Sequence, residues 1–551
     1  MGGFVSAVAA TSMQNVSMDI NSPTVDLGYS IHQATLNSSG QYPYLNFSNI
    51  RYGHAPVGSL RFAAPESPRG RNATINDGQH DSICPQALPA WLLTAEDFLG
   101  NYLTGQNISS FTDPIHEMTV RSTALSVDPR SNEDCLFLDV IVPQKIFNAT
   151  NSTETVTRNA GNKAGAPVLV WIHGGGYVYG SKTSSGNPAS LVAASLENEK
   201  EGMIYVAMNY RLGLFGWLAG DSKVTANAGL LDQRLALEWV QTNINLFGGD
   251  PNRVTVMGES AGAGSILHHI TAYGGTKDRA PFQRAIPQSP AFIPIVPSQE
   301  KALFREVIGN ASLLSNTTVK TVGQLKNLPY KVLSGVNMLL TGRNANEGLI
   351  FTNPAVQTQS EYISTLEQAL PSADASVIFH LQLANVLYPP IYNGSYGYTS
   401  SIERLALSIS HFTIACNAYS LVSAPSKISP RNVNASSPSS SYAYLFSIPP
   451  GIHGLDVPYT FFNGDTAGGT LQEPPVMTNI ATALQRFLTE FVISGDPSSS
   501  GVFVEYDKND TVTSIGIAGL KHVGDPAADS RCDNSRIVVA SHNEGRLMRA
   551  H

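Results

Sequence analysis

Ser260 is the residue whose surroundings most clearly suggest chemistry, because it is the centre of Gly258-Glu-Ser-Ala-Gly262. A Gly-x-Ser-x-Gly motif presents a nucleophilic serine when a strand enters the turn and a helix leaves it. Residues 253–257 alternate as a short buried strand does, and apolar residues recur at helical spacing after the turn. The bare pattern is weak in a chain with 47 glycines, but this context predicts a serine nucleophile.

A serine nucleophile needs a base to accept its proton and an acid to orient that base. In hydrolases with this motif the chain order is serine, then acid, then histidine. His453 lies in a glycine-flanked turn, residues 450–456, directly after a predicted strand, and we predict that it is the base. The other histidines at a useful distance after the serine lie in predicted helical or tail segments: His380, His411, His522, His542 and His551.

Glu347 is the acid that this order favours. It lies in a tight polar turn, residues 344–348, between two apolar runs, where a carboxylate at a sheet edge would face the histidine. The alternative is a solvated loop glutamate, which would be the better interpretation without the rest of the pattern.

Donors for an oxyanion come from His173-Gly-Gly-Gly176, which follows a predicted buried strand. Glycines there let backbone N–H groups approach a substrate, and we predict an oxyanion hole made by Gly175, Gly176 and Ala261. A phosphate-binding turn is the rival interpretation. It fails because no Gly-Lys-Ser/Thr ending follows, and Ser181-Lys182 comes later in the wrong order. Such a serine mechanism needs no metal and no cofactor.

Several apolar segments must position these groups. Residues 136–142, 167–172 and 203–208 have the continuous apolar character of strands covered on both faces. An amphipathic helix over 230–247 then leads directly into the nucleophile strand. This alternation predicts an α/β fold with a doubly wound, mostly parallel central sheet.

The carboxyl-terminal half is predicted to be mainly helical. Interrupted helices are expected over 300–340 and 357–425, apart from a loop at 389–398, with a possible strand at 339–342. A strand at 442–447 and an amphipathic helix at 477–493 follow. Exposed loops are expected at 148–165 and 426–441.

Length and composition indicate one large compact unit rather than several. The chain has 551 residues, 42% hydrophobic and 14% charged, and we expect a single domain over 1–551. A net charge of −8 without a basic run argues against nucleic acid as a partner. No stretch approaches 18 uninterrupted apolar residues, so no transmembrane segment is expected.

Cysteines and glycosylation motifs suggest the secretory route. Four cysteines allow two bridges in three connectivities. Residues 1–20 are interpreted as a remnant signal or a disordered segment, with Ala7-Val-Ala9 as a possible cleavage signal and a cytosolic protein as the alternative. A dozen Asn-x-Ser/Thr sequons are spread along the chain: Asn15, Asn37, Asn46, Asn72, Asn107, Asn148, Asn151, Asn310, Asn316, Asn393, Asn434 and Asn509.

From about Ser48 to the carboxyl end, the chain resembles the type-B carboxylesterase/lipase family of α/β-hydrolases, which includes cholinesterases and fungal secreted lipases. Beside His173-Gly-Gly-Gly176 and Gly258-Glu-Ser-Ala-Gly262, the resemblance rests on segments at 51–62, 132–139, 209–211, 227–237, 247–250 and 346–348.

The resemblance implies an α/β-hydrolase fold with lid or gorge insertions and a serine carboxylic ester hydrolase that forms an acyl-serine on a small-molecule ester. It implies that Ser260, Glu347 and His453 form the triad. It also implies disulfides Cys84–Cys135 and Cys416–Cys532, and roles for Glu259 and Ser289 in supporting the triad by hydrogen bonds.

Two features depart from the family pattern. The segment between Ser260 and Glu347 is short, which suggests a lost piece around residues 297–330 and an altered acyl pocket. Trp91 is too near Cys84 to match the choline-binding tryptophan, so a choline ester is not expected. The segment between Cys84 and Cys135 reads as an apolar loop, either a lid or gorge wall or an ordinary pinned surface loop. Alternatives for the whole chain are a lipase, a tailoring esterase of a secondary metabolite, or a non-catalytic binding protein.

Overall fold

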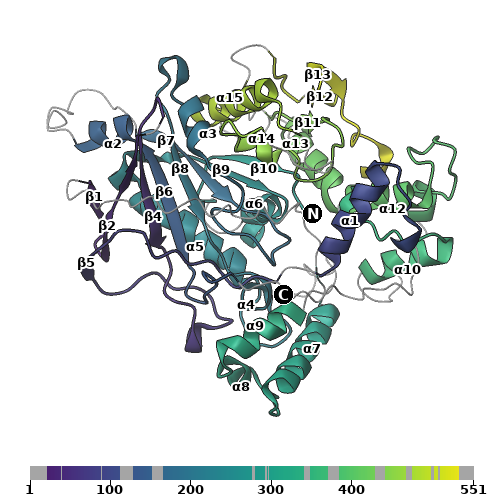
Figure 1. Ribbon diagram of the computed structural model, residues 1–551, viewed down its shortest axis with the longest axis horizontal. Coiled ribbons are helices and arrows are strands. Elements are labelled where there is room, and N and C mark those ends of the chain that lie inside the picture. The colour runs from purple at the N-terminus through teal and green to yellow at the C-terminus, as the bar shows by residue number, and fades with distance from the viewer. Residues whose placement is uncertain are drawn as a thin grey trace.

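A seven-stranded mixed sheet forms the centre of the computed structural model (Figure 1), with the strand order β10-β9-β7-β8-β6-β4-β3. The pairs β10–β9, β9–β7 and β7–β8 are parallel, whereas the remaining three pairs are antiparallel. The parallel character is therefore confined to the half of the sheet whose strand β9 leads into Ser260. The strands are β3 (Thr35–Asn37), β4 (Tyr44–Arg51), β6 (Phe137–Pro143), β7 (Ala166–Ile172), β8 (Ile204–Met208), β9 (Gly249–Glu259) and β10 (Arg284–Gln288).

The structure describes most of the chain from residue 22 to residue 532. The described residues are 22–38, 40–87, 90–111, 128–151, 165–275, 280–291, 295, 297–339, 348–369, 384–427, 441–466, 475–497, 502–506 and 509–532.

The continuous apolar strands are explained by cover on both faces of the sheet. In β7 every residue is buried, and alternate residues enter two different cores. Val168 and Val170 pack with α5 (Ala228–Asn243), whereas Leu169 and Trp171 pack with α3 (Ala189–Ala194) and α15 (Thr478–Ser494). Figure 1 shows α5 on one side of the sheet and α3 with α15 on the other.

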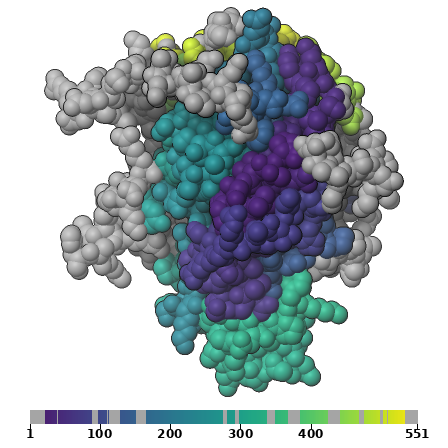
Figure 2. All heavy atoms as spheres, turned by 90° about the vertical axis from the view of Figure 1, so that its left-hand side faces the viewer, coloured from purple at the N-terminus to yellow at the C-terminus, as the bar shows by residue number. Residues whose placement is uncertain are grey.

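The helices of the carboxyl-terminal half confirm the helical prediction. Three of them form a projection at the lower end of the molecule in Figures 1 and 2 and pack against α4 (Gly213–Trp217). These three are α7 (Pro297–Ser315), α8 (Val322–Lys326) and α9 (Tyr330–Leu339). Others are α10 (Gln359–Ala369), α12 (Ser401–Ser410), a π-helical segment (His411–Ala415) and α13 (Cys416–Lys427).

Two small sheets complete the described architecture. One joins β1 (Thr24–Asp26), β2 (Ser30–Gln33) and β5 (Asn72–Asn76). The other joins β11 (Tyr444–Phe446), β12 (Thr511–Gly516) and β13 (Gly519–Gly524), with β11 parallel to β12.

Two segments predicted as loops are helical where they are described. Helix α1 (Ala90–Leu103) lies between Cys84 and Cys135, and its residues Ala95, Phe98 and Leu99 are buried at helical spacing. Helix α2 (Gln144–Asn151) extends into the first residues of the predicted loop at 148–165, because Ile146 and Phe147 pack into the core and stabilise the helix. The apolar residues of each segment therefore serve as a buried helical face.

Both disulfides have the implied pairing. Cys84 bonds Cys135 and Cys416 bonds Cys532, closing segments with sequence separations of 51 and 116. Closure of loops of these lengths restricts the unfolded chain and, in the chain-entropy model, stabilises the fold by about 4 kcal/mol for the shorter loop and about 5 kcal/mol for the longer one.

Some predictions fall outside the described residues. These are the signal or disordered segment at 1–20, the acid Glu347, the sequons Asn15 and Asn434, and most of the loop at 426–441. The possible strand at 339–342 has only its first residue described, and Leu339 ends α9.

One run of the described chain, Ser401–Ser423, is long and apolar enough to span a membrane by composition, with a mean hydropathy of 1.3. Core helices pass the same test, and 44% of the relevant window is buried within the fold. Its Arg404 is also buried, with its guanidinium stacked over the Tyr362 ring at 3.7 Å. The run is therefore weak support for a membrane span.

Candidate active site

Ser260 occupies a strained turn between β9 and α6 (Ala261–Thr271), with φ 57° and ψ −124°. A non-glycine residue in such a conformation costs on the order of 1–3 kcal/mol and persists only when its surroundings impose it. The flanking glycines are required by close packing. A Cβ at Gly262 would lie 2.0 Å from the carbonyl oxygen of Ile172, and one at Gly258 would lie 2.8 Å from the same atom.

Backbone hydrogen bonds hold the strained serine in place. Its N–H donates to the carbonyl oxygen of Gln288 at 3.0 Å, which ties the turn to the end of β10. Its own carbonyl oxygen accepts from Gly264 at 2.8 Å and from Ala291 at 3.2 Å. The turn is thus fixed on both sides, and Ser260 is 8% exposed.

The glycine-rich loop after β7 lies directly beside the serine. Because β7 and β9 are parallel neighbours, their carboxyl ends meet at the same edge of the sheet. A Cβ at Gly174 would lie 3.1 Å from the Cβ of Ser260. Gly175 and Gly176 have φ values of 101° and 58°, and Gly175 accepts hydrogen bonds from Val178 and Tyr179. This arrangement places the loop that carries the predicted donors Gly175 and Gly176 against Ser260, the residue before Ala261.

His173 supports this loop from below. Its Nδ1 lies 2.8 Å from the carbonyl oxygen of Gly174, and its ring stacks on Tyr210 with centroids 4.4 Å apart. The hydroxyl of Tyr210 also donates to the carbonyl oxygen of His173 at 2.8 Å. Burial lowers the pKa of His173 to about 4, so the ring is neutral near pH 7 and Nδ1–H donates to Gly174. The sequence motif includes His173, but the sequence did not predict that Tyr210 would pack against it.

His453 lies in the turn between β11 and α14 (Val457–Thr460), with 13% of its side chain exposed. Its Nε2 is 2.9 Å from Oε1 of Glu259, the residue before the nucleophile. Oε1 has no hydrogen-bond partner of good geometry, so this contact is electrostatic. Glu259 therefore lies close enough to act on His453, and its predicted role in supporting the triad stays a prediction.

A short helix brings the chain from the predicted acid to the histidine. The 3-10 helix η8 (Gly348–Phe351) begins one residue after Glu347. Its last residue, Phe351, packs on His453 with ring centroids 5.6 Å apart. Glu347 itself lies outside the described residues.

Asp456 belongs to a buried polar cluster behind the histidine and was not singled out from the sequence. It accepts hydrogen bonds from the Tyr444 hydroxyl at 2.6 Å and from Gln288 Nε2 at 3.1 Å. Burial and then the charge of Glu259 raise the pKa of Asp456. Ser289, which is predicted to support the triad, has φ 49°, and its neighbour Gln288 donates to Tyr444 and Thr460 in this cluster. The one sequence signal for Asp456 is its position three residues after His453, in the same turn.

Known proteins resemble this chain in sequence and in fold. A model of the carboxylesterase family matches residues 31–378, more than half of the chain. A protein named carboxylesterase patB from Aspergillus clavatus is 36% identical over 93% of this chain and 95% of its own length. The protein of the same name from Penicillium expansum is also 36% identical, over 87% of this chain and 89% of its own.

Among solved structures, EstA of Aspergillus niger has the same fold, with a TM-score of 0.69 at 21% identity over 94% of this chain and 98% of that one. The family match and the two relatives of nearly full length show that this chain belongs to the carboxylesterase family.

Proposed function

We propose that this chain hydrolyses carboxylic esters through an acyl-serine intermediate on a triad of Ser260, Glu347 and His453. The observation that carries the proposal is the strained Ser260, held against the glycine-rich loop after β7. The strain is stored where a nucleophile has to be exposed to a bound carbonyl group.

In the proposed reaction, His453 takes the proton of Ser260 as Oγ attacks the ester carbonyl carbon. The carbonyl oxygen becomes an oxyanion, which accepts hydrogen bonds from the amides of Gly175, Gly176 and Ala261. The carbon–oxygen bond to the alcohol then breaks, and His453 gives its proton to the leaving alcohol. Water repeats the sequence on the acyl-serine, which releases the acid and restores the serine.

Two contacts support the roles of the base and the acid. The carboxylate of Glu259 near Nε2 of His453 favours the imidazolium that forms during each half-reaction. Phe351, four residues after Glu347, packs on the same ring, which supports Glu347 as the group that orients it. The start of α6 directly follows Ser260, so the positive end of its helix dipole favours negative charge that develops beside the serine.

The test is hydrolysis of p-nitrophenyl esters from acetate to palmitate, together with labelling by a fluorophosphonate measured by intact mass. We expect turnover and a single covalent adduct in the wild type, and a loss of about 10⁴-fold or more in kcat for Ser260→Ala. Ser334→Ala is the matched control, because Ser334 is a partly exposed serine on α9 whose hydroxyl donates to the carbonyl oxygen of Lys331 in the same helix. A folded wild type that neither hydrolyses any ester nor takes the label would refute the proposal, and the chain-length profile would separate an esterase from a lipase.

We also propose that the chain follows the secretory route and carries glycans at its exposed sequons. The two disulfides are of the kind that persists in oxidising compartments. Asn46 lies within β4, paired on either side with β3 and β6, and its side-chain amide oxygen is buried. Glycopeptide mass spectrometry should therefore find Asn46 unmodified, and a fully occupied Asn46 would contradict this. Glycans are expected on Asn72, Asn107, Asn148, Asn316, Asn393 and Asn509.

A further inference from the structure

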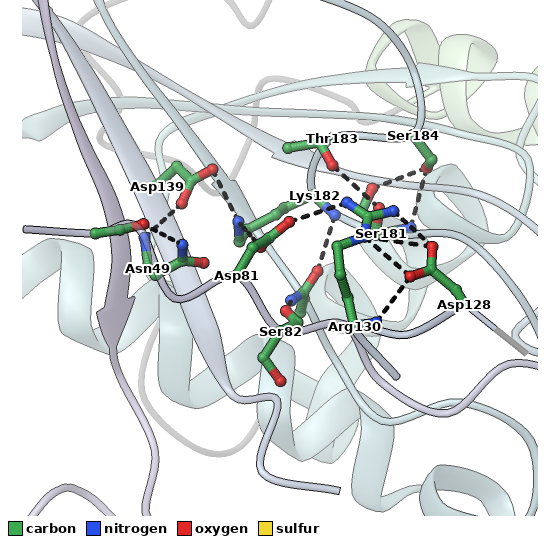
Figure 3. Close-up of polar contacts among 12 residues, drawn as sticks. Asn49, Asp81, Ser82, Asp128, Arg130, Asp139, Ser181, Lys182, Thr183 and Ser184 are labelled. Atoms are coloured by element: carbon green, nitrogen blue, oxygen red, sulfur yellow. Dashed lines mark hydrogen bonds and ion pairs between the residues drawn. The ribbon is translucent and has the colours of Figure 1, made fainter. Parts of the chain in front are cut away.

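Lys182, a few residues after the glycine-rich loop, has a buried charged side chain. Only 2% of its side chain is exposed. Its ammonium lies 3.0 Å from Oδ2 of Asp139 in β6 and 3.2 Å from Oδ1 of Asp81. Figure 3 shows the ammonium between these two carboxylates. Burial disfavours the charge, but the carboxylates outweigh burial and hold the pKa of Lys182 above its ordinary value.

The two carboxylates belong to parts of the chain that are far apart in sequence. Asp81 lies just before Cys84 and also accepts from Arg130 Nη1 at 2.9 Å. Arg130 lies shortly before Cys135 and pairs with Asp128 as well. The ammonium therefore joins a central strand to both ends of the segment that the Cys84–Cys135 disulfide closes.

The backbone around Lys182 is fixed to the same segment. The N–H of Lys182 donates to Asn209 Oδ1 at 2.9 Å, and Asn209 Nδ2 donates to the carbonyl oxygen of Ser82 at 2.7 Å. Two residues earlier, Gly180 donates to Gln86 Oε1 at 2.6 Å and accepts from Gln86 Nε2 at 3.0 Å. Residues 180–182, which follow the glycine-rich loop, are thus fixed by the contacts of Lys182 and by the hydrogen bonds of Gln86 to Gly180.

Residues 180–182, which follow the glycine-rich loop, pack tightly against residues 173 and 174 at its start. A Cβ at Gly180 would lie 2.5 Å from Nδ1 of His173 and 2.7 Å from the carbonyl oxygen of Gly174. Gly174 in turn lies against Ser260. A displacement at residues 180–182 would therefore be transmitted to the loop that holds Gly175 and Gly176.

We propose that Lys182 is a positioning residue for the oxyanion donors, because its buried ammonium fixes residues 180–182 against β6 and the disulfide-closed segment. This inference rests on the proposed ester hydrolysis. Catalytic donors must be held to within about 0.5 Å, and a misplacement of about 1 Å can cost about 100-fold in rate. Lys182 does not need to touch the substrate to have this effect.

The alternative is that the ammonium only stabilises the fold. Lys182→Met alone cannot separate the two, because it leaves Asp139 buried without its cation. Lys182→Met combined with Asp139→Asn removes that charge, while residue 139 can still accept the 2.8 Å hydrogen bond from the N–H of Asn49. Asp81 keeps Arg130 in both variants. Lys200→Met is the matched control, since Lys200 pairs with Glu490 on α15.

The experiment measures kcat, KM, the midpoint of thermal unfolding and inhibition by a trifluoromethyl ketone, which forms an oxyanion on the serine. In the double variant we expect the unfolding midpoint to return towards wild type while kcat stays about 10- to 100-fold low. We expect KM to change little and the ketone to bind more weakly by the same factor as kcat. Lys200→Met should leave kcat and ketone binding unchanged.

The inference is overturned if the double variant regains wild-type kcat together with its stability, or if its kcat falls no further than that of Lys200→Met. Fluorophosphonate labelling of Ser260 and ester turnover in the wild type test the proposed function separately. A failure of the inference with intact wild-type turnover is therefore distinct from a failure of the function.

Discussion

Replacement of Gly174 by alanine should impair catalysis by adding one methyl group between the glycine-rich loop and the nucleophile. The new Cβ would lie 2.8 Å from the carbonyl oxygen of Glu259, 2.9 Å from its Oε2 and 3.1 Å from the Cβ of Ser260. Gly174 does not have a left-handed φ, so alanine there costs no backbone strain. The expected effect is therefore steric.

The size of the effect follows from these contacts. Restoring an ordinary 3.4 Å separation from the Glu259 oxygen requires the loop to move by about 0.6 Å, because that oxygen belongs to the backbone of β9. A displacement of that size exceeds the tolerance of about 0.5 Å for a catalytic constellation. We expect kcat to fall by about 10- to 50-fold, which is about 1.4–2.3 kcal/mol in the activation free energy.

The assay is steady-state hydrolysis of p-nitrophenyl acetate, with thermal unfolding recorded for each variant. Gly309→Ala is the control, because Gly309 lies within α7, lacks a left-handed φ and has no atom within 4 Å of an added Cβ. It should keep wild-type kcat and gain about 0.5–1 kcal/mol of stability. Wild-type kcat in a folded Gly174→Ala variant would refute the placement of the loop beside Ser260.

Two further predictions concern buried charge. Arg211→Met leaves the fully buried Asp232 without its two guanidinium hydrogen bonds and should lower the free energy of unfolding by about 3–5 kcal/mol. In urea denaturation, Arg211→Met with Asp232→Asn should recover most of this loss, because the neutral amide oxygen can still accept the 3.0 Å hydrogen bond from the N–H of residue 211. Equal instability of both variants would contradict the argument. Burial lowers the pKa of His269 from 6.5 to about 3, so its neutral form stabilises the fold above pH 6.5 and this contribution is lost as the pH falls towards 3. His269→Gln should reduce the pH slope of the unfolding free energy between pH 6 and pH 4 by about 1.4 kcal/mol per pH unit, and an unchanged slope would argue against it.

Local patterns in the sequence were sufficient to predict the strands of the parallel half and the strand, turn and helix around Ser260. The strand, turn and helix around Ser260 are contiguous, so the two glycines and the buried run before them carry the information within about 20 residues. The loop His173-Gly-Gly-Gly176 could also be located from local sequence. It directly follows β7, and a strand covered on both faces is recognisable as a continuous apolar run. The helical spacing of Ala95, Phe98 and Leu99 is equally local, but our prediction of a loop for this segment is wrong.

Contacts between distant segments were decided only by the tertiary structure. The approach of His453 to Glu259 and the burial of Asp456 depend on how the turn after β11 packs on the end of β9. Lys182 shows the difference most clearly. In the sequence it was a lysine in the wrong order for a phosphate-binding turn, with nothing to show that its charge is buried. Asp139 lies 43 residues before it and Asp81 lies 101 residues before it. A sequence shows which residues can ionise, but the cost of burying a charge and the partners that offset it exist only once the chain has folded.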